Sequence, residues 1–302
     1  MDQTMLKSRF KHLEPDFYDI YRQFSDGFTS SSCERSWANL MLYMPVYDWH
    51  AAVISECLWV ASFKEKYIFF PAGRAVDPET LFKVCKWFDD FCGGGSVCGD
   101  VPADYFQNFP VAADFFTQEV DPGEADYIYD LRHLASFSGS KLRKRHNQIR
   151  QFERCYENIF RVEKMQKSHI GQVLALAEKL SCDIWKSDSG QEEKLSLQRL
   201  ELLWNDPCCG LNGVLLYVQD SLAGFSIYSP LSDQIADIHF EKADHTFTGA
   251  GAKLTAVLVE QLLAENFTFM NREQDLNVEG LRRAKRALDP DHLLERAVLT
   301  LI

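Results

Sequence analysis

The chain has 302 residues, of which 46% are hydrophobic and 25% are charged, a balance typical of globular proteins and not of disordered ones. Its formal net charge of −12 argues against general coating of nucleic acid. Nine cysteines, an odd number without a CxxC pair, indicate reduced thiols rather than a disulfide framework or a zinc site.

The length suits one large domain or two of about 150 residues, and we start from two. Residues 1–16 lack the apolar core of a signal peptide, and no run approaches the ~18 apolar residues that cross a bilayer. We therefore expect a cytoplasmic protein with no transmembrane segment.

The first half is predicted to contain helices and short strands. Helices are expected near 14–24, 34–42, 78–91 and 102–107, and strands near 51–55, 57–63, 66–70, 96–99 and 114–119. Turn-forming residues are dense over 121–140, so we place the boundary there. The predicted units are 1–135 and 136–302, and a basic helix over 140–156 opens the second.

The second half has the clearer pattern. We expect strands at 157–165, 213–219, 222–229, 234–244, 267–271 and 297–302, and helices from Ser168, near 192–204, after 249–251 and over 281–288. The order is β, α, α, β, β, β, α, β, α, β. The first half repeats this rhythm less clearly, which favours two copies of one α+β unit.

Positive charge is concentrated in one helix. KLRKRHNQIR, residues 141–150, holds five Lys or Arg and no acid, which leaves −17 on the remaining residues. At ~100° per residue, Arg143, Asn147, Arg150 and Arg154 share an arc beside an apolar stripe. This arc suits the phosphates of a defined polyanion, although a solvated face of a packed helix would show the same pattern.

Three further stretches carry polar groups where a sheet meets a helix. Strict alternation over 234–244 puts Asp237, His239 and Glu241 on one face. This polar row could supply a general base and the groups that orient the attacking amine, or it could form a purely structural network. Gly249 and Gly251 precede a helix and can present backbone N–H groups to phosphate, or form an ordinary turn.

The third stretch, NREQD (271–275), follows a buried strand directly. Arg272 and Glu273 would be costly to bury alone, so they must pair with each other, with the acidic row or with substrate. They form either a pocket wall or an internal brace. The next helix presents Arg282, Lys285 and Arg286 as a second basic edge.

SWANLMLY (36–43), SGSKLRKRHNQIRQF (138–152), HFEKAD (239–244) and NREQDLNVEGLRRAK (271–285) resemble, in order and content, motifs of the bacterial family related to the C-terminal domain of phosphatidylglycerol lysyltransferase. The resemblance covers nearly the whole chain. It implies an α+β fold of two tandem GNAT (acyl-CoA N-acyltransferase-like) units, with mixed, mostly antiparallel sheets flanked by helices. Related tandem proteins, including the Fem-type aminoacyltransferases, move an amino acid from aminoacyl-tRNA to an amine or hydroxyl.

One stretch departs from the usual acyl-donor loop of GNAT proteins. That loop begins with Arg or Gln and continues with two residues, Gly, any residue, and Gly or Ala. Here the six residues are TFTGAG (246–251), so the glycines fit and the leading Arg or Gln is missing.

The resemblance favours a pocket wall over an internal brace for residues 271–275. It also suggests a role for each candidate residue. Catalytic roles are expected for Glu241, His239 and Glu273. Substrate contacts are expected for Lys242, Asp244, Asn271, Arg272 and Asp275. Contacts to donor phosphates are expected for Arg143, Lys144, Asn147, Arg150, Gly249, Gly251, Arg282 and Lys285. We expect no metal site and no permanently bound cofactor.

The predicted function is acyl transfer by direct attack of an amine or hydroxyl, with aminoacyl-tRNA preferred over acyl-CoA as co-substrate. The expected partners are tRNA or coenzyme A and a small-molecule, lipid or peptide acceptor, and not DNA. The alternative is a noncatalytic tandem-GNAT protein that binds a small anionic ligand or a partner. In a third possibility, the polar motifs only join the two units.

Overall fold

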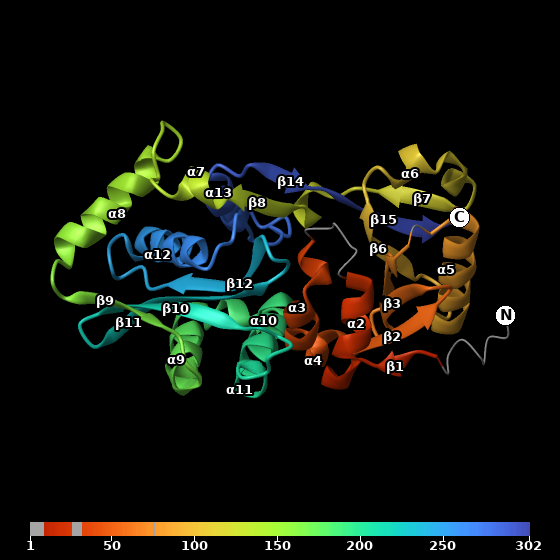
Figure 1. The fold of residues 1–302 in the computed structure, drawn as a ribbon, viewed down its shortest axis with the longest axis horizontal. Coiled ribbons are helices and arrows are strands. Elements are labelled where there is room, and N and C mark those ends of the chain that lie inside the picture. The colour runs from red at the N-terminus through yellow and green to blue at the C-terminus, as the bar shows by residue number, and fades with distance from the viewer. Residues whose placement is uncertain (1–8, 26–31, 75) are drawn as a thin grey trace. The chain divides into compact units, whose positions relative to one another are not determined.

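A computed structural model describes residues 9–25, 32–74 and 76–302. The first eight residues, which belong to the segment assessed for a signal peptide, lie outside this description. The described chain is α+β, as predicted, with two mixed sheets flanked by helices (Figure 1).

Packing divides the chain into two compact units that interleave in sequence. Of the described residues, the first unit contains 9–25, 44–74, 76–125 and 295–302, and the second contains 32–43 and 126–294. The predicted boundary between residues 135 and 136 was meant to divide two copies of one α+β unit, and this division stays a prediction.

The first unit is built on one mixed sheet with the order β1-β2-β3-β4-β6-β15-β7, and β5 pairs with β3. Its strands are β1 (Lys11–His12), β2 (Trp49–Ile54), β3 (Cys57–Ser62), β4 (Tyr67–Phe69), β5 (Ala72–Gly73), β6 (Val97–Pro102), β7 (Phe116–Glu119) and β15 (Arg296–Leu301). Its helices are α2 (Tyr18–Ser25), α4 (Met44–Tyr47), α5 (Pro78–Cys92) and α6 (Tyr105–Asn108). Asp77 caps α5, Pro78 opens it and Gly93 ends it in the left-handed region.

The C-terminal strand β15 belongs to the sheet of the first unit. It pairs antiparallel with β6 and β7, and the buried Arg296 lies 3.0 Å from the Asp100 carboxylate. The sequence order had suggested that this strand closes the second unit, and that expectation was wrong. Local pattern identifies a strand but cannot choose its partner, because pairing is set by long-range packing.

The second unit holds a sheet of order β14-β8-β13-β12-β11-β10-β9. Its strands are β8 (Asp126–Asp130), β9 (Phe160–Lys164), β10 (Asn212–Val218), β11 (Ser221–Pro230), β12 (Ile235–Ala243), β13 (Phe269–Asn271) and β14 (His292–Leu294). Its helices are α3 (Trp37–Leu42), α7 (Leu131–Leu134), α8 (Arg143–Cys155), α9 (Ile170–Ser181), α10 (Asp188–Gln198), α11 (Leu200–Leu203), α12 (Ala250–Ala264) and α13 (Glu279–Arg286). Only the β12–β13 pair is parallel among the pairings described in this sheet.

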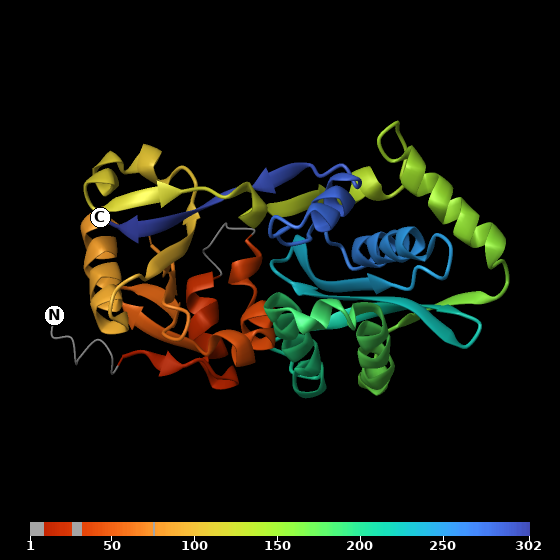
Figure 2. The same ribbon diagram turned by 180° about the vertical axis from the view of Figure 1, so that it is seen from behind.

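Helices cover both faces of this second sheet. The long apolar α12 lies on one face, and α9 and α10 lie on the other (Figure 1). On the α12 side, Leu142, Ile149 and Phe152 of the α8 region join a continuous core with strand residues, as the apolar stripe of that helix predicts. The view from behind shows β8 and β14 side by side, the arrangement that their antiparallel pairing requires (Figure 2).

Two strands of this sheet were missed from the sequence. The segment 121–140 contains β8 and α7, although its turn-forming residues had indicated a boundary loop. The missed signal in β8 is the Tyr-Ile-Tyr run at 127–129, which is buried. Among the described residues the short strand β14 pairs with β8 alone, so it too depends on a partner that the local sequence does not reveal.

Candidate active site

The parallel strands β12 and β13 separate inside the sheet of the second unit. They pair from Ile235 with Phe269 to Asp237 with Asn271, and there β13 ends while β12 continues to Ala243. The chain after β13 therefore separates from β12, but it stays hydrogen-bonded to Tyr127 of β8 through the backbone of Arg272 and Glu273. Such a separation leaves backbone groups of β12 without a strand partner near the centre of the sheet.

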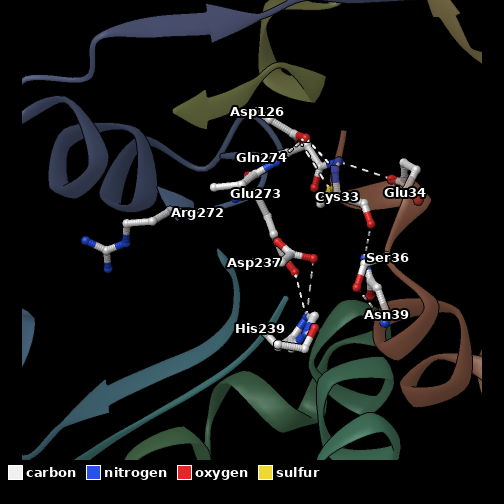
Figure 3. A network of polar contacts seen from close by, with 12 residues as sticks. Cys33, Glu34, Ser36, Asn39, Asp126, Asp237, His239, Arg272, Glu273 and Gln274 are labelled. Carbon is white, nitrogen blue, oxygen red and sulfur yellow. Dashed lines mark hydrogen bonds and ion pairs between the residues drawn. The ribbon is translucent and has the colours of Figure 1, made fainter. Parts of the chain in front are cut away.

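Arg272 and Glu273 lie at this separation and point in opposite directions (Figure 3). Glu273 has a backbone φ of 56°, and its N–H donates to the Asn271 side chain at 2.6 Å. A residue other than glycine in the left-handed region is uncommon and marks a sharp turn of the chain. The turn sends Arg272 toward α12 and Glu273 toward the opposite face of the sheet.

A β-bulge in β12 separates the residues that strict alternation had grouped. Pairing with β11 jumps from Tyr228–Ile238 to Ile227–Phe240, so His239 is an extra residue. One extra residue reverses the alternation beyond it. Glu241 therefore faces α12, whereas Asp237 and His239 face the other side. The expected row of Asp237, His239 and Glu241 on one face was wrong for Glu241.

On the α12 side, Glu241 and Arg272 form a largely buried ion pair. Arg272 Nη2 lies 2.8 Å from Glu241 Oε1, and their side chains are 16% and 12% exposed. Thr255 of α12 donates to the same oxygen at 2.9 Å. Glu241 Oε2 is buried and has no hydrogen-bond partner among the described residues. One oxygen is thus held in place while the other is left to accept a proton or a hydrogen bond.

Arg145 of α8 brings a second guanidinium toward this pair. Burial lowers its pKa, the positive charge of Arg272 lowers it further, and the nearby Glu241 carboxylate and Tyr129 oppose these effects. One Arg145 nitrogen also donates to the Ala284 carbonyl at 3.4 Å. Two guanidinium groups beside one carboxylate leave this part of the site with a net positive charge, which favours an anionic ligand.

A basic pocket of about 330 Å³ lies between α8 and α13. This volume is at the lower end of the range for small-molecule sites, about 300–1,000 Å³. The pocket is lined by Lys144, Arg145, Gln148, Gly280, Arg283, Ala284 and Ala287. Lys144 was predicted to contact donor phosphates, and Arg145 connects the pocket to the Glu241–Arg272 pair.

The other predicted phosphate contacts divide into two groups. Arg143, Asn147 and Arg150 are exposed on α8, and none of the three forms an ion pair with a residue in the described part of the chain. Arg282 instead binds the Asp275 carboxylate through two nitrogens, at 2.9 and 2.8 Å. Lys285 donates to the carbonyls of Arg272 and Gln274, and burial lowers its pKa to about 8. Arg282 and Lys285 therefore brace the chain after β13.

Asn271 and Asp275 also take part in this internal bracing. Asn271 donates to the buried Asp126 carboxylate at 2.8 Å, and the backbone N–H of Cys33 donates to the same oxygen at 2.8 Å. Asp275 accepts from the Tyr127 hydroxyl at 2.7 Å. Burial alone would raise the pKa of Asp275, but the hydrogen bonds from Arg282 and Tyr127 lower it. Contact of Asn271 or Asp275 with substrate stays a prediction.

Lys242 and Asp244 are fixed by residues of the α9 and α10 region. Lys242 Nζ lies 2.8 Å from Glu193, and Asp244 lies 2.6 Å from Lys179. Burial would raise the pKa of Asp244, but Lys179 and Thr246 lower it to about 2. These two predicted substrate contacts lie apart from the Glu241–Arg272 pair because Lys242 faces the opposite side of the sheet.

The two glycines at the start of α12, Gly249 at its N-cap and Gly251 in its first turn, have different surroundings. Gly249 has a φ of 80°, and a Cβ there would lie 2.4 Å from the Gln148 carbonyl, so glycine lets α8 approach. A Cβ on Gly251 would have its nearest neighbour at 3.8 Å, in Ala243. The conformation and packing explain Gly249 without a ligand, whereas Gly251 has room beside it.

His239 and Glu273, two of the predicted catalytic residues, meet on the face opposite Glu241. His239 Nδ1 lies 3.4 Å from Glu273 Oε1 and 3.7 Å from Asp237 Oδ2. Burial, the Glu273 charge and the Asp126 charge raise the pKa of Asp237 well above its usual value. The predicted catalytic set is therefore divided by the sheet into Glu241 on one side and His239 with Glu273 on the other.

The sequence prediction missed Arg145, Asp126 and Cys33. A signal existed for Arg145, because at ~100° per residue it falls inside the arc of Leu142, Ile149 and Phe152. An arginine within an apolar stripe must be buried and paired or line a pocket. No local pattern marks Asp126 or Cys33, since their contact joins residues 93 positions apart.

Two sheet-and-helix units, a parallel strand pair that separates within its sheet and a bulged strand beside that gap define the class of tandem GNAT-like proteins. A tandem GNAT protein from the clavulanic acid biosynthesis pathway superposes with a TM-score of 0.52 at 10% identity, over 97% of this chain and 98% of that one. The chain belongs to the family described as phosphatidylglycerol lysyltransferase, C-terminal, whose model matches residues 26–299. The resemblance seen in the sequence is confirmed.

Two further solved structures are similar to this chain. A conserved protein of unknown function from Bacteroides thetaiotaomicron has a TM-score of 0.86 and 24% identity, over 97% of this chain and 99% of that one. L-PGS from Bacillus licheniformis has a TM-score of 0.63 and 13% identity, over 96% and 92%. Family and fold support acyl transfer as the general class of reaction. In the part of the chain that the structure describes, no helix is both long and apolar enough to span a membrane.

Proposed function

We propose that the protein transfers an aminoacyl group from aminoacyl-tRNA to an amine or hydroxyl acceptor, with Glu241 as the general base. The observation that carries this proposal is the hydrogen bonding of the two Glu241 carboxylate oxygens. Arg272 and Thr255 fix one oxygen, and the other is buried without a partner among the described residues. A buried acceptor without a donor is costly, so an incoming N–H or O–H group would be favoured there.

Basic residues provide the donor side of the site. Lys144, Arg145 and Arg283 line the pocket between α8 and α13, and Arg143 and Arg150 lie on exposed positions of the same helix α8. The pocket suits a terminal phosphate and its ribose, and the exposed arginines suit the phosphates that follow. Cations that line a pocket and continue along an exposed helix face fit an extended polyanion better than a compact one.

The transfer needs no covalent enzyme intermediate. The acceptor nitrogen or oxygen bonds to the ester carbonyl carbon, and its proton passes to Glu241. Backbone N–H groups of β12, beyond its last pair with β13, are the candidates to hold the oxyanion. The bond between the carbonyl carbon and the ribose oxygen then breaks, the ribose hydroxyl leaves with the proton, and Glu241 is ionised again.

The loop before α12 supports tRNA over coenzyme A. A pyrophosphate at this loop would need free backbone N–H groups. The N–H of Thr246 donates to Asp244, that of Thr248 to the Tyr156 hydroxyl and that of Ala250 to the Phe247 carbonyl. These three amides are already occupied, and the Arg or Gln that usually opens such a loop is absent.

The test compares lysyl-tRNA with acetyl-CoA in binding and single-turnover transfer. Acceptors would be phosphatidylglycerol vesicles and a short peptide with a free amine. Glu241→Gln keeps the shape of the side chain and should slow transfer by about 10²–10⁴-fold, with donor affinity unchanged. The exposed Glu178→Gln is the matched control and should transfer at the wild-type rate. If neither donor binds at low salt, or if Glu241→Gln transfers normally, the proposal is wrong.

A second candidate function is noncatalytic binding of a small anionic ligand. The observation in its favour is the basic pocket of about 330 Å³, because its volume suits a small molecule better than a nucleic acid. Donor binding without transfer to any acceptor would favour this function. Loss of transfer with intact binding in Glu241→Gln would favour the enzyme.

A further inference from the structure

We propose that Asp237, His239 and Glu273 form a binding site for one divalent transition-metal cation, on the face of the sheet opposite Glu241. No metal site was expected from the sequence, because the three ligands come from a bulged strand and a distant turn and have no metal-binding spacing. The three side chains point toward one another (Figure 3). This inference concerns metal binding alone and does not depend on the proposed transfer reaction.

The spacing of the three ligand atoms fits a metal ion. One atom from each residue lies within 4.8 Å of the other two. His239 Nδ1 is 3.4 Å from Glu273 Oε1 and 3.7 Å from Asp237 Oδ2. Bonds of ~2.1 Å at tetrahedral angles separate ligand atoms by about 3.4 Å. The cluster is therefore close to the dimensions of three corners of a coordination tetrahedron.

Buried atoms without partners point into the cluster. Both Asp237 carboxylate oxygens, His239 Nδ1 and Glu273 Oε1 make no hydrogen bond to any described residue. The side chains of Asp237 and His239 are fully buried. Buried polar atoms are nearly always satisfied in proteins, so four such atoms around one point indicate a missing ligand.

The remaining nitrogen of His239 is already oriented. Nε2 lies 2.8 Å from the Ser229 hydroxyl on β11, the neighbouring strand. When Nε2–H donates to this oxygen, the lone pair of Nδ1 faces the two carboxylates. Metal-binding histidines characteristically make such a second hydrogen bond, which fixes the ring and its tautomer.

The local charge balance also calls for a cation. Asp237 lies in the field of the Glu273, Asp126 and Glu34 carboxylates, and the nearby Ser36 hydroxyl makes no hydrogen bond to it. Lys285 is one cation that interacts with Glu273 and Asp126 from the α13 side. Arg272 is turned away from the cluster (Figure 3). Its guanidinium is instead paired with Glu241. Asp237 and Glu273 place two carboxylates beside His239, and a divalent ion would balance their charge.

The ligand set narrows the class of metal. One imidazole nitrogen and two carboxylate oxygens suit zinc, manganese or ferrous iron, and no thiolate is present to favour copper(I). Three protein ligands leave at least one position open to water. The bound ion would also tie β12 to the turn after β13, because two ligands come from the strand and one from the turn.

The experiment measures zinc and manganese binding to the full chain after dialysis against a chelator. Titration calorimetry should give one ion per chain, and saturating zinc should raise Tm by about 5 °C. Asp237→Asn and His239→Gln should each weaken binding by more than about 100-fold, and Ser229→Ala by about 10-fold. The exposed His245→Gln is the control for adventitious histidine binding and should bind as the wild type does.

Asp237→Asn is nearly isosteric and removes a buried negative charge, so the metal-free variant should fold and melt no lower than the wild type. A second measurement needs no variant. Manganese should broaden the NMR resonances of the His239 ring and leave those of His245 sharp. The proposal is overturned if the wild type binds neither ion below about 1 mM, if the Asp237 and His239 variants bind normally, or if manganese leaves His239 sharp.

Discussion

Arg272 reaches Glu241 across the gap between β13 and β12, with 2.8 Å between Nη2 and Oε1. The two residues lie 31 positions apart and on strands that no longer pair at this point. Because both side chains are largely buried, each charge is stabilised mainly by the opposite charge of its partner. This dependence gives the first prediction.

Arg272→Ala should lower the free energy of unfolding by about 3 kcal/mol, because it leaves the Glu241 carboxylate buried and unpaired. Urea unfolding would measure the change. Adding Glu241→Gln to Arg272→Ala should recover much of the loss, since the unpaired charge is then removed. Arg283→Ala, an exposed neighbour, should change stability by less than about 0.5 kcal/mol. An additive double variant would contradict the pairing.

The exposed arginines of α8 should determine how strongly salt weakens tRNA binding. Replacing Arg143 or Arg150 by Ala should each reduce the slope of log K against log salt by about 1, because one phosphate contact is lost. Filter binding at several salt concentrations measures the slope. Lys83→Ala, on the exposed face of α5, is the control. Unchanged slopes in both α8 variants would mean that this helix does not contact the nucleic acid.

The Asp244–Lys179 ion pair should make stability depend on pH in the acid range. Hydrogen bonds and the Lys179 charge lower the pKa of Asp244 to about 2, from 3.8 in the unfolded chain. The stabilisation is therefore complete above about pH 4 and lost as the pH falls toward 2. At pH 7, Asp244→Asn should be less stable by about 1–2 kcal/mol, a value reduced for the solvent-exposed Lys179.

Urea unfolding of Asp244→Asn and wild type between pH 2 and 7 would test this window. The difference between the two proteins should disappear near pH 2. Asp183→Asn is the matched control, because Asp183 and its partner Lys186 are both highly exposed. A difference that persists unchanged at pH 2 would rule out the ionised pair as its source.

Gly249 and Gly251 form a matched pair for separating packing from ligand binding. Gly249→Ala should cost about 2–4 kcal/mol, because its φ is positive and its Cβ would meet the Gln148 carbonyl at 2.4 Å. Gly251→Ala should be neutral or slightly stabilising, by up to about 1 kcal/mol. If donor phosphate approaches Gly251, that variant will bind donor more weakly at unchanged Tm, so unchanged donor affinity would remove Gly251 from the site.

Most elements could be predicted from the sequence because they depend on short-range pattern. The apolar stripe of α8 and the hairpin β10–β11 follow from residue spacing alone, and the structure contains both. The pairing of β15 with β6 could not be predicted, since the same local sequence fits the edge of either sheet. The family motif NREQDLNVEGLRRAK also identified NREQD as a candidate site segment, although its contacts could not be predicted.

The candidate site was predicted in its residues but not in its arrangement. One bulge at His239 moved Glu241 to the opposite face, and the turn at Glu273 separated this residue from Arg272. Neither irregularity has a reliable local signature, because a bulge is stabilised by the strands on both sides. The position of Arg145 in its apolar stripe was the one overlooked local clue.

By itself, the sequence determined the α+β class, the tandem plan, the basic helix and the family, because periodicity and motif order are properties of neighbouring residues. The tertiary structure alone decided which charges meet: Glu241 with Arg272 and Arg145 on one face, and Asp237 with His239 and Glu273 on the other. The physical reason is that a charge becomes costly only when it is buried, and burial is defined by strands and helices that come together from distant parts of the chain.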